Sequence, residues 1–134
     1  MNYEKITIQT RDSGVEGKLS FFEIKETHFI MKRFYYIYDV PTKVKRGGHA
    51  HKQLKQLLFC PYGRIRIELD DGNEKKSEIL DSPQKALLLQ PGIWREMYWI
   101  KDNSVLCVAA SEEYDEDDYI RNYEEFLKWK REIR

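Results

Sequence analysis

The chain has 134 residues, with 23 basic and 23 acidic side chains, so its formal net charge is zero. This balance argues against a general nucleic-acid binder, which needs a basic excess to neutralise phosphates. The length fits one domain, residues 1–134, with a hydrophobic core of its own, and no apolar run approaches the roughly 20 residues of a membrane span.

The N-terminus and the cysteines both indicate a cytoplasmic protein that does not bind membranes. Residues 1–5, Met-Asn-Tyr-Glu-Lys, lack the basic and then apolar layout of a secretion signal. Cys60 and Cys107 lie in separate apolar stretches, so we expect two buried free thiols in a reducing compartment.

Short β-favouring stretches separated by turns fill most of the chain. Residues 64–69 alternate charged and apolar side chains, which is typical of a half-buried strand, and Asp-Asp-Gly-Asn at 70–73 predicts a hairpin turn. Spacing of about ten residues between strands favours an all-β barrel or sandwich. The expected strands are 3–8, 19–24, 29–40, the stretch around 49–51, 57–60, 64–69, 77–80, 85–89, 94–100 and 105–109.

The C-terminal segment changes to a helical pattern, and we predict a helix over about residues 117–132. Its apolar positions are spaced to form one face, and acidic residues at its start and basic residues at its end suit the helix dipole. We interpret the acidic run 115–118 as the helix N-terminus, with metal binding as the alternative. The apolar positions are Tyr119, Ile120, Tyr123, Phe126, Leu127 and Ile133.

The most informative motif is the stretch 46–51, Arg-Gly-Gly-His-Ala-His. His49 and His51 are one residue apart, so on a strand both rings point to the same side of the sheet. An imidazole with a pKa near ~6.5 can accept and donate protons at neutral pH. The pair is consistent with metal binding, with proton transfer, or with a polar strand that merely tolerates two histidines.

The spacing around the histidines matches a metal-site template whose ligands are partly replaced. His51, Gln56 and Gly63 follow the spacing of the first cupin motif, in which two histidines and a glutamate bind a metal; here Gln56 takes the glutamate position. Arg95 follows a Pro-Gly turn and falls where the second motif places a histidine. Glutamine is a weak donor and arginine cannot donate, so we predict a site without metal, where Arg95 suits a phosphate or an oxyanion.

Further motifs carry a family resemblance. With them, the sequence resembles the nucleotide-linked sugar 3,4-ketoisomerases of the cupin superfamily (FdtA/QdtA-like and WxcM-like enzymes). The motifs are Lys-Arg at 32–33, Tyr-Tyr-Ile at 35–37, the histidine stretch 46–51, Leu-Asp-Asp-Gly at 69–72, Leu-Asp-Ser-Pro at 80–83, Trp94, and Tyr-Asp-Glu-Asp-Asp-Tyr-Ile-Arg at 114–121.

The resemblance implies a fold, a substrate and an assembly. The fold is a cupin-type (RmlC-like) antiparallel β-barrel or jelly roll with a C-terminal α-helix. The substrate is a dTDP-linked 4-keto-6-deoxy sugar, no metal or organic cofactor takes part, and the protein is a homodimer whose N-terminal strand is exchanged between subunits. The chain departs from the family pattern at Glu16-Gly17, at His28-Phe29 and at Arg95, where some members have histidine.

The residue roles follow from this chemistry. We assign His51 to proton abstraction from carbon and His49 to the second proton transfer, with the order open. Arg33 and Tyr35 share one face of their strand, which we expect to face inward, placing Arg33 on the diphosphate and Tyr35 on the sugar. The opposite face, Phe34, Tyr36 and Tyr38, is then core or dimer contact.

Four further residues are candidates for substrate binding. Arg46 is a second diphosphate contact or a solvated loop arginine. Gln56 suits a sugar hydroxyl, Arg95 an anionic group, and Trp94 either the thymine or sugar ring or the core.

The predicted activity is that of a dTDP-4-keto-6-deoxy-D-glucose 3,4-ketoisomerase, acting through an enediol in dTDP-3-amino-3,6-dideoxyhexose biosynthesis for cell-surface glycans. We expect the gluco product. The alternatives are a 3,5-epimerase-like enzyme, a non-catalytic nucleotide-sugar-binding cupin and a metal-dependent oxygenase.

Overall fold

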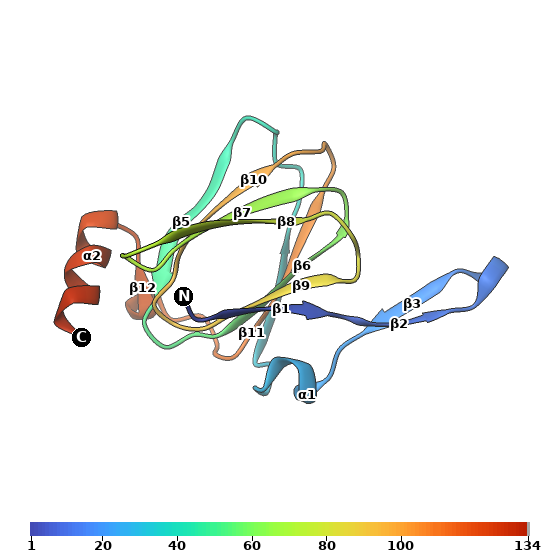
Figure 1. Ribbon diagram of the computed structural model, residues 1–134, viewed down its shortest axis with the longest axis horizontal. Helices are drawn as coiled ribbons and strands as arrows, with labels where there is room; N and C mark the ends of the chain where they lie inside the picture. The colour runs from blue at the N-terminus through green and yellow to red at the C-terminus, as the bar shows by residue number, and fades with distance from the viewer. Residues whose placement is uncertain (134) are drawn as a thin grey trace.

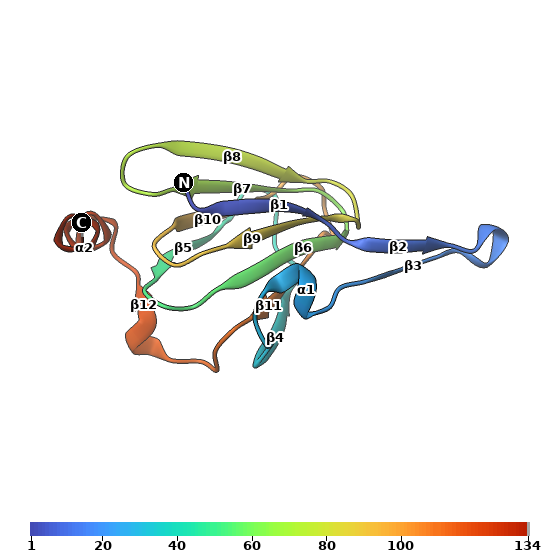
Figure 2. The ribbon, with the colours of Figure 1, turned by 60° about the horizontal axis from the view of Figure 1, so that its bottom comes forward.

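The computed structural model describes residues 1–133 and consists of two antiparallel five-stranded sheets packed face to face. In Figure 2 the strands formed by residues 65–70 and 75–80 of the second sheet lie above those formed by residues 56–62 and 105–110 of the first. The first sheet has the order β1 (Tyr3–Thr7), β9 (Lys85–Leu89), β6 (Gln56–Tyr62), β11 (Val105–Ala110) and β4 (Arg33–Ile37). The second has the order β12 (Tyr119–Ile120), β5 (Lys45–His51), β10 (Trp94–Trp99), β7 (Ile65–Asp70) and β8 (Lys75–Leu80).

The core lies between the two sheets, as the alternating pattern predicts. On β7, Ile65, Ile67 and Leu69 are at most 1% exposed, and they meet Leu58 and Val108 of the first sheet in one cluster. Side chains on alternate strand positions reach one face, so this period of two fixes which face of each strand is buried. The all-β double-sheet fold with a C-terminal helix is confirmed.

A glycine turn joins β6 to β7, at the Gly63 that follows the spacing of the first cupin motif. Gly63 has φ +109°, and a Cβ there would lie 1.9 Å from Oγ of Ser104. That hydroxyl accepts a hydrogen bond from the backbone N–H of Arg64 at 2.9 Å, so the turn packs directly on the loop before β11. Only glycine fits both the backbone angle and the space.

The N-terminal third contains a projecting hairpin that the sequence pattern did not indicate. Strands β2 (Gln9–Asp12) and β3 (Lys18–Phe21) extend away from the sheets, with Val15 fully exposed in the short helix η1 (Gly14–Glu16) at the tip (Figure 1). The short helix α1 (Ile24–Thr27) then replaces the end of the predicted strand 19–24, because Glu23 and Glu26 form a reciprocal capping box.

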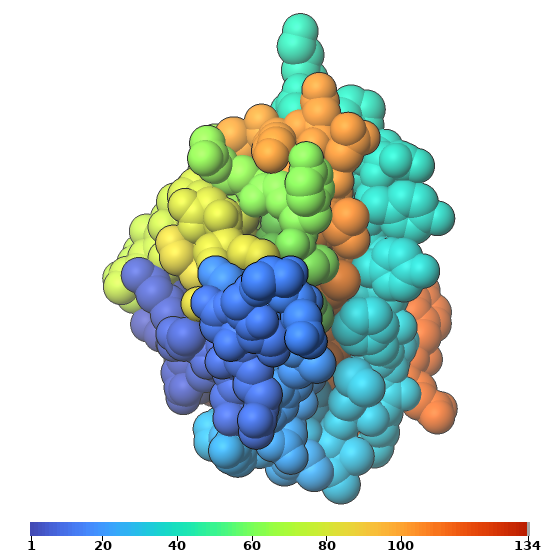
Figure 3. Space-filling model, turned by 90° about the vertical axis from the view of Figure 1, so that its right-hand side faces the viewer, coloured from blue at the N-terminus to red at the C-terminus, as the bar shows by residue number. Residues whose placement is uncertain are grey.

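The outer face of β4 is aromatic and exposed. Phe34, Tyr36 and Tyr38 are 45%, 58% and 57% exposed, and the chain around them forms a ridge beside the hairpin (Figure 3). The inward face carries Arg33 and Tyr35, which is the orientation expected from the sequence. The strand itself is shorter than the predicted 29–40.

The C-terminal helix α2 (Tyr123–Glu132) begins at Tyr123 rather than at residue 117. Asn122 is its N-cap and accepts a hydrogen bond from the N–H of Glu125. The residues before it form the short helix η2 (Glu116–Asp118) and β12, which pairs Tyr119 with His51 and Ile120 with Ala50. Tyr119 and Ile120 fit the helical spacing of the segment, yet they form a strand because their backbone pairs with the open edge of β5. None of the helices formed by residues 1–133 is long and apolar enough to cross a bilayer.

Candidate functional site

The two histidines of β5 share one face of the strand, as the sequence predicts. The ring centroids of His49 and His51 are 5.0 Å apart, and the ring planes are inclined by 82°. Tyr119 of β12 packs against both rings, at 4.4 Å from His51 and 5.2 Å from His49. The two imidazoles and one phenol therefore form a compact aromatic group at the edge of the second sheet.

His51 is buried and has a carboxylate partner. The residue is 1% exposed, and its Nδ1 lies 3.1 Å from Oδ2 of Asp118. Within residues 1–133, Nε2 of His51 and Nε2 of His49 are buried and have no hydrogen-bond partner. Among the described residues, each ring therefore has one nitrogen, Nε2, that is free to form a hydrogen bond with a bound substrate.

Burial and nearby arginines keep both rings neutral at neutral pH. Desolvation, reinforced by the charge of Arg95, lowers the pKa of His49 to about 3 and that of His51 to about 2. A neutral imidazole has one N–H and one nitrogen lone pair, so each ring can act as a hydrogen-bond donor and as a base.

A buried chain of hydrogen bonds runs behind the histidines. Arg95 is fully buried; it donates to the carbonyl of Ile93 at 3.0 Å and to Oε1 of Gln56. Gln56 then donates through Nε2 to the hydroxyl oxygen of Tyr35 at 3.1 Å. Because that oxygen accepts a bond, the proton of Tyr35 is free to be donated to another group, and burial raises the pKa of this hydroxyl.

Arg95 is a cation without a carboxylate partner in the described part of the chain. Its contacts with Ile93 and Gln56 are with neutral oxygens. Burial lowers its pKa to about 10, so the guanidinium still carries its charge at neutral pH. The interior beside the two imidazoles is therefore positive, which favours a group that becomes negative.

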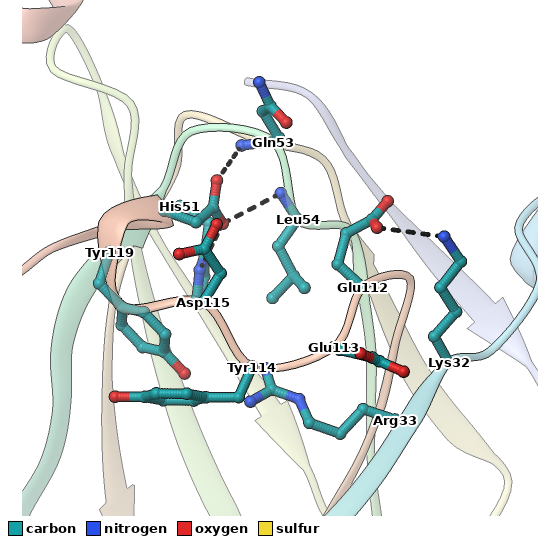
Figure 4. Close-up of a pocket in the computed structure, with 11 residues that line it drawn as sticks. Lys32, Arg33, His51, Gln53, Leu54, Glu112, Glu113, Tyr114, Asp115 and Tyr119 are labelled. Atoms are coloured by element: carbon teal, nitrogen blue, oxygen red, sulfur yellow. Dashed lines mark hydrogen bonds and ion pairs between the residues drawn. The ribbon is translucent and has the colours of Figure 1, made fainter.

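Two cavities meet at this group of residues. The first, of about 590 Å³, is lined by His51, Asp118 and the segment between β11 and β12 (Figure 4). The second, of about 520 Å³, is lined by His49, Tyr35 and Arg46. Arg33, Tyr114 and Tyr119 line both, and Figure 4 shows the Arg33 side chain reaching Tyr114 beside Tyr119.

Arginines give the second cavity a positive wall, whereas the first is lined by Lys32 and Arg33 together with four acidic residues, Glu112, Glu113, Asp115 and Asp118. The guanidinium of Arg33 lies 5.3 Å from the ring centre of Tyr35 and 5.6 Å from that of Tyr114, and its Nε and Nη2 have no hydrogen-bond partner within residues 1–133. Arg46 is exposed at the rim of the second cavity. Arginine forks suit phosphate oxygens, so this wall can bind a diphosphate.

The structure brings most, but not all, of the predicted site residues together. His49, His51, Arg33, Tyr35 and Arg46 line the cavities. Gln56 and Arg95 lie behind the wall: Gln56 reaches a cavity only through its hydrogen bond to Tyr35, and Arg95 acts on the site through its charge.

Trp94 lies outside the site. Successive residues of β10 point to opposite faces, so Trp94 faces away from Arg95 and packs against Tyr123 and Phe126 under α2. Trp94 lines neither of the two cavities, so its predicted contact with thymine or sugar has no support from them, and it packs with Ala50, Ile120 and Phe126 as its alternative core position predicts.

Asp118 is the residue that the sequence analysis missed. It belongs to the acidic run interpreted as a helix start, whereas its carboxylate accepts hydrogen bonds from the N–H groups of Gln53 and Leu54 at 2.8 and 3.3 Å and contacts His51. The family motif at 114–121 was a signal that this segment carries more than a cap. Within residues 1–133, no three His, Cys, Asp or Glu side chains are grouped so as to hold a metal ion.

This geometry defines a cupin-type double sheet with paired neutral histidines beside a cavity with a positive wall, a site that can bind an anionic substrate and exchange protons with it. The family model described as "WxcM-like, C-terminal" (FdtA) matches residues 1–131, and the chain belongs to this family.

Characterised relatives share most of the chain. It is 43% identical over 129 residues to TDP-4-oxo-6-deoxy-alpha-D-glucose-3,4-oxoisomerase of Aneurinibacillus thermoaerophilus, covering 96% of this chain and 89% of that protein. A 3,4-ketoisomerase of Helicobacter canadensis has a similar structure, with a TM-score of 0.94, 39% identity and 98% of each chain covered. A histidine-to-asparagine variant of the 3,4-ketoisomerase QdtA of Thermoanaerobacterium thermosaccharolyticum, solved with TDP-4-keto-6-deoxyglucose, has a TM-score of 0.93 and 36% identity, covering 98% of this chain and 95% of that one.

A distant neighbour confirms the RmlC-like fold. The RmlC epimerase of Mycobacterium tuberculosis is 16% identical, with a TM-score of 0.73 over 87% of this chain and 66% of that one.

Proposed function

We propose that this protein is a dTDP-4-keto-6-deoxy-D-glucose 3,4-ketoisomerase. The observation that carries the proposal is the pair of neutral imidazoles, the half-buried His49 and the buried His51, whose buried Nε2 atoms have no partner within residues 1–133. They lie beside a positive interior and an arginine-lined cavity. Membership of a family whose compared members carry this activity supports the same reaction here.

The reaction moves a carbonyl by two proton transfers. In the proposed mechanism, Nε2 of His51 removes the proton from C3, and the C–H electron pair forms the C3–C4 double bond while charge develops on the oxygen at C4. Tyr35 donates a hydrogen bond to that oxygen, and the buried charge of Arg95 stabilises it. The intermediate is an enediol.

The second half returns a proton to carbon. The hydroxyl at C3 gives its proton to His49 as its oxygen becomes the carbonyl, C4 takes a proton from the hydroxyl of Tyr35, and His49 delivers its proton to the oxygen at C4, which becomes a hydroxyl. The proton that His51 took from C3 is then released and Tyr35 is reprotonated through solvent, so the site returns to its starting state. His49 carries the proton between the oxygens. One C–H bond is broken and one is formed, so substrate and product are isomers and no external oxidant is needed.

The nucleotide part is proposed to bind along the positive wall. Arg33 has two unpaired donor nitrogens among the described residues and lines both cavities, so it suits the diphosphate. Arg46, exposed at the rim, suits a second phosphate contact.

Incubation with the 4-keto nucleotide sugar in deuterated buffer tests the proposal. We expect a 3-keto product with deuterium at C4, detected by NMR, and the same spectrum reports the C4 configuration, which we propose is gluco. Unchanged substrate would refute the isomerase. Exchange at C3 and C5 with the ketone kept at C4 would instead indicate an epimerase.

We also propose a cytoplasmic homodimer whose product enters dTDP-3-amino-3,6-dideoxyhexose biosynthesis. The projecting hairpin and the exposed ridge of Phe34, Tyr36 and Tyr38 support association with a second copy, because exposed apolar patches usually mark interfaces. Within the single chain, β1 pairs with β9, the place that an exchanged strand would take. Light scattering at micromolar concentration should give twice the mass of the 16.2 kDa chain.

A further inference from the structure

We propose that Gln56 is a positioning residue that directs the hydroxyl proton of Tyr35 into the cavity, and that Arg95 fixes the amide orientation which this requires. The inference rests on the proposed function and deepens it, because Tyr35 is the proposed proton donor to C4. Gln56 and Arg95 lie at two ligand positions of the cupin metal template. In this chain the two positions thus orient a proton donor.

The orientation of the Gln56 amide follows from its neighbours. A guanidinium can only donate hydrogen bonds, so the amide atom that faces Arg95 must be the oxygen Oε1. The other end of the amide is then the NH₂ group, whose Nε2 lies 3.1 Å from the hydroxyl oxygen of Tyr35. Gln56 is only 1% exposed, so bulk water could not replace these contacts if the amide were reversed.

Arg95 is itself held in place. Its Nε and Nη2 donate to the carbonyl oxygen of Ile93 at 3.3 and 3.0 Å, which leaves Nη1 directed at Gln56. Arg95 lies on β10, the central strand of the second sheet, and Gln56 lies on β6, the central strand of the first. The contact therefore joins the middles of the two sheets, where both backbones are fixed by pairing on each side.

The hydroxyl proton of Tyr35 points into the cavity as a result. An amide NH₂ group can only donate, so the Tyr35 oxygen accepts this bond and its own hydrogen must point elsewhere. The ring lines the second cavity together with His49, so a sugar bound there supplies an acceptor. Burial raises the pKa of this hydroxyl, whereas the charge of Arg95 and the bond from Gln56 oppose the rise.

The same bond stabilises Tyr35 after it has given up its proton. In the step at C4, the electron pair of the enediol double bond forms the new C4–H bond, and the O–H electron pair stays on the phenolic oxygen. The resulting phenolate accepts a stronger hydrogen bond from Nε2 of Gln56 and is favoured by the charge of Arg95. Gln56 thus acts both before and after the proton transfer.

The variant Gln56→Glu tests the positioning with little change in packing. One carboxylate oxygen keeps the contact with Arg95, and the other faces Tyr35, whose hydroxyl must then donate to it and not to the substrate. We expect kcat to fall about 10²–10⁴-fold with KM little changed, because Gln56 lines neither cavity. Gln84→Glu is the matched control: it adds the same charge in the loop before β9, outside both cavities, and should keep the native kcat. A native kcat in Gln56→Glu would overturn the proposal.

Two further readouts separate positioning from a merely structural effect. In deuterated buffer, the ratio of deuterium uptake at C3 of recovered substrate to product formation should rise at least about tenfold in Gln56→Glu, because His51 still removes the proton while delivery to C4 is blocked. In a Tyr35→Phe background, the loss of kcat caused by Gln56→Glu should be at least about tenfold smaller, since the amide acts through this hydroxyl. An unchanged ratio, or equal losses in the two backgrounds, would overturn the proposal.

A spectroscopic measurement needs no turnover. The side-chain NH₂ of Gln56 should give two ¹H–¹⁵N signals, and the signal of the hydrogen bonded to Tyr35 should move upfield in Tyr35→Phe. No change in this pair of signals would overturn the proposal. An inactive native protein would refute the proposed function, while this measurement would still test the contact on which the positioning depends.

Discussion

The two neutral rings make the stability of the fold depend on pH in a defined window. In the folded protein the pKa values of His49 and His51 are lowered to about 3 and about 2, whereas in the unfolded chain an imidazole titrates near ~6.5. As the pH falls below about 6.5, the unfolded chain takes up protons that the folded protein does not bind. Stability is therefore complete above this pH and is lost on acidification, until the folded rings titrate.

The magnitude follows from the two pKa values. Each pH unit below the unfolded value costs about 1.4 kcal/mol per ring, so at pH 5 each ring costs about 2 kcal/mol and the pair about 4 kcal/mol. Urea unfolding at pH 8 and pH 5 measures this loss. In His49→Asn and in His51→Asn the loss should be smaller by about 2 kcal/mol than in the native protein.

The comparison is made within each variant, so a change in overall stability does not affect it. His28→Asn is the control: the His28 ring is exposed, and its φ of +61° is one that asparagine accepts. This variant should lose as much stability as the native protein. If His49→Asn and His51→Asn also lose as much, the rings are protonated in the folded state and the reasoning is refuted.

Three further outcomes are expected. Gln56→Leu leaves the buried Arg95 without its side-chain acceptor and should cost about 3 kcal/mol in urea unfolding; a cost below about 1 kcal/mol would contradict this contact. Gly63→Ala places a Cβ 1.9 Å from another side chain at φ +109° and should cost clearly more than Gly14→Ala, which has φ +65° and open space and should cost about 1 kcal/mol; equal costs would contradict the packing. His51→Asn should lower kcat about 10²–10⁴-fold while calorimetry gives an unchanged affinity for dTDP, and lost dTDP binding would contradict its role in chemistry alone.

The sheets could be predicted because strand periodicity is local. Alternation in residues 64–69 places Ile65, Ile67 and Leu69 in the core, and the same period places both histidines on one face. Failures occurred where tertiary contacts overrode local preference. Tyr119 is one of the apolar residues whose spacing predicts a helix, yet in the structure it forms part of β12 and pairs with the open edge of β5.

The candidate site could be predicted only in part from the sequence, because some of its residues are brought together by tertiary contacts rather than by local spacing. The spacing of two residues predicts that His49 and His51 lie side by side on one face of a strand. Asp118 is 67 residues from His51 in the sequence and contacts it only because β12 pairs with β5. Nothing local distinguishes Asp118 from the other acidic residues beside it. Similarly, the arginine in the second cupin motif indicates a cation, whereas its full burial behind Gln56 depends on how the two sheets pack.

The pairing of β12 with β5 also has a consequence for how the protein is made. A ribosome delivers the chain from its N-terminus, so the strands from β1 to β11 emerge before the segment that contacts His51. A nascent chain can bury its core while the imidazoles still lack their last neighbours. Intermediates that end before residue 115 should thus lack the contacts of Asp118 and Tyr119 with His51, and competence for catalysis should be acquired only after that segment has emerged.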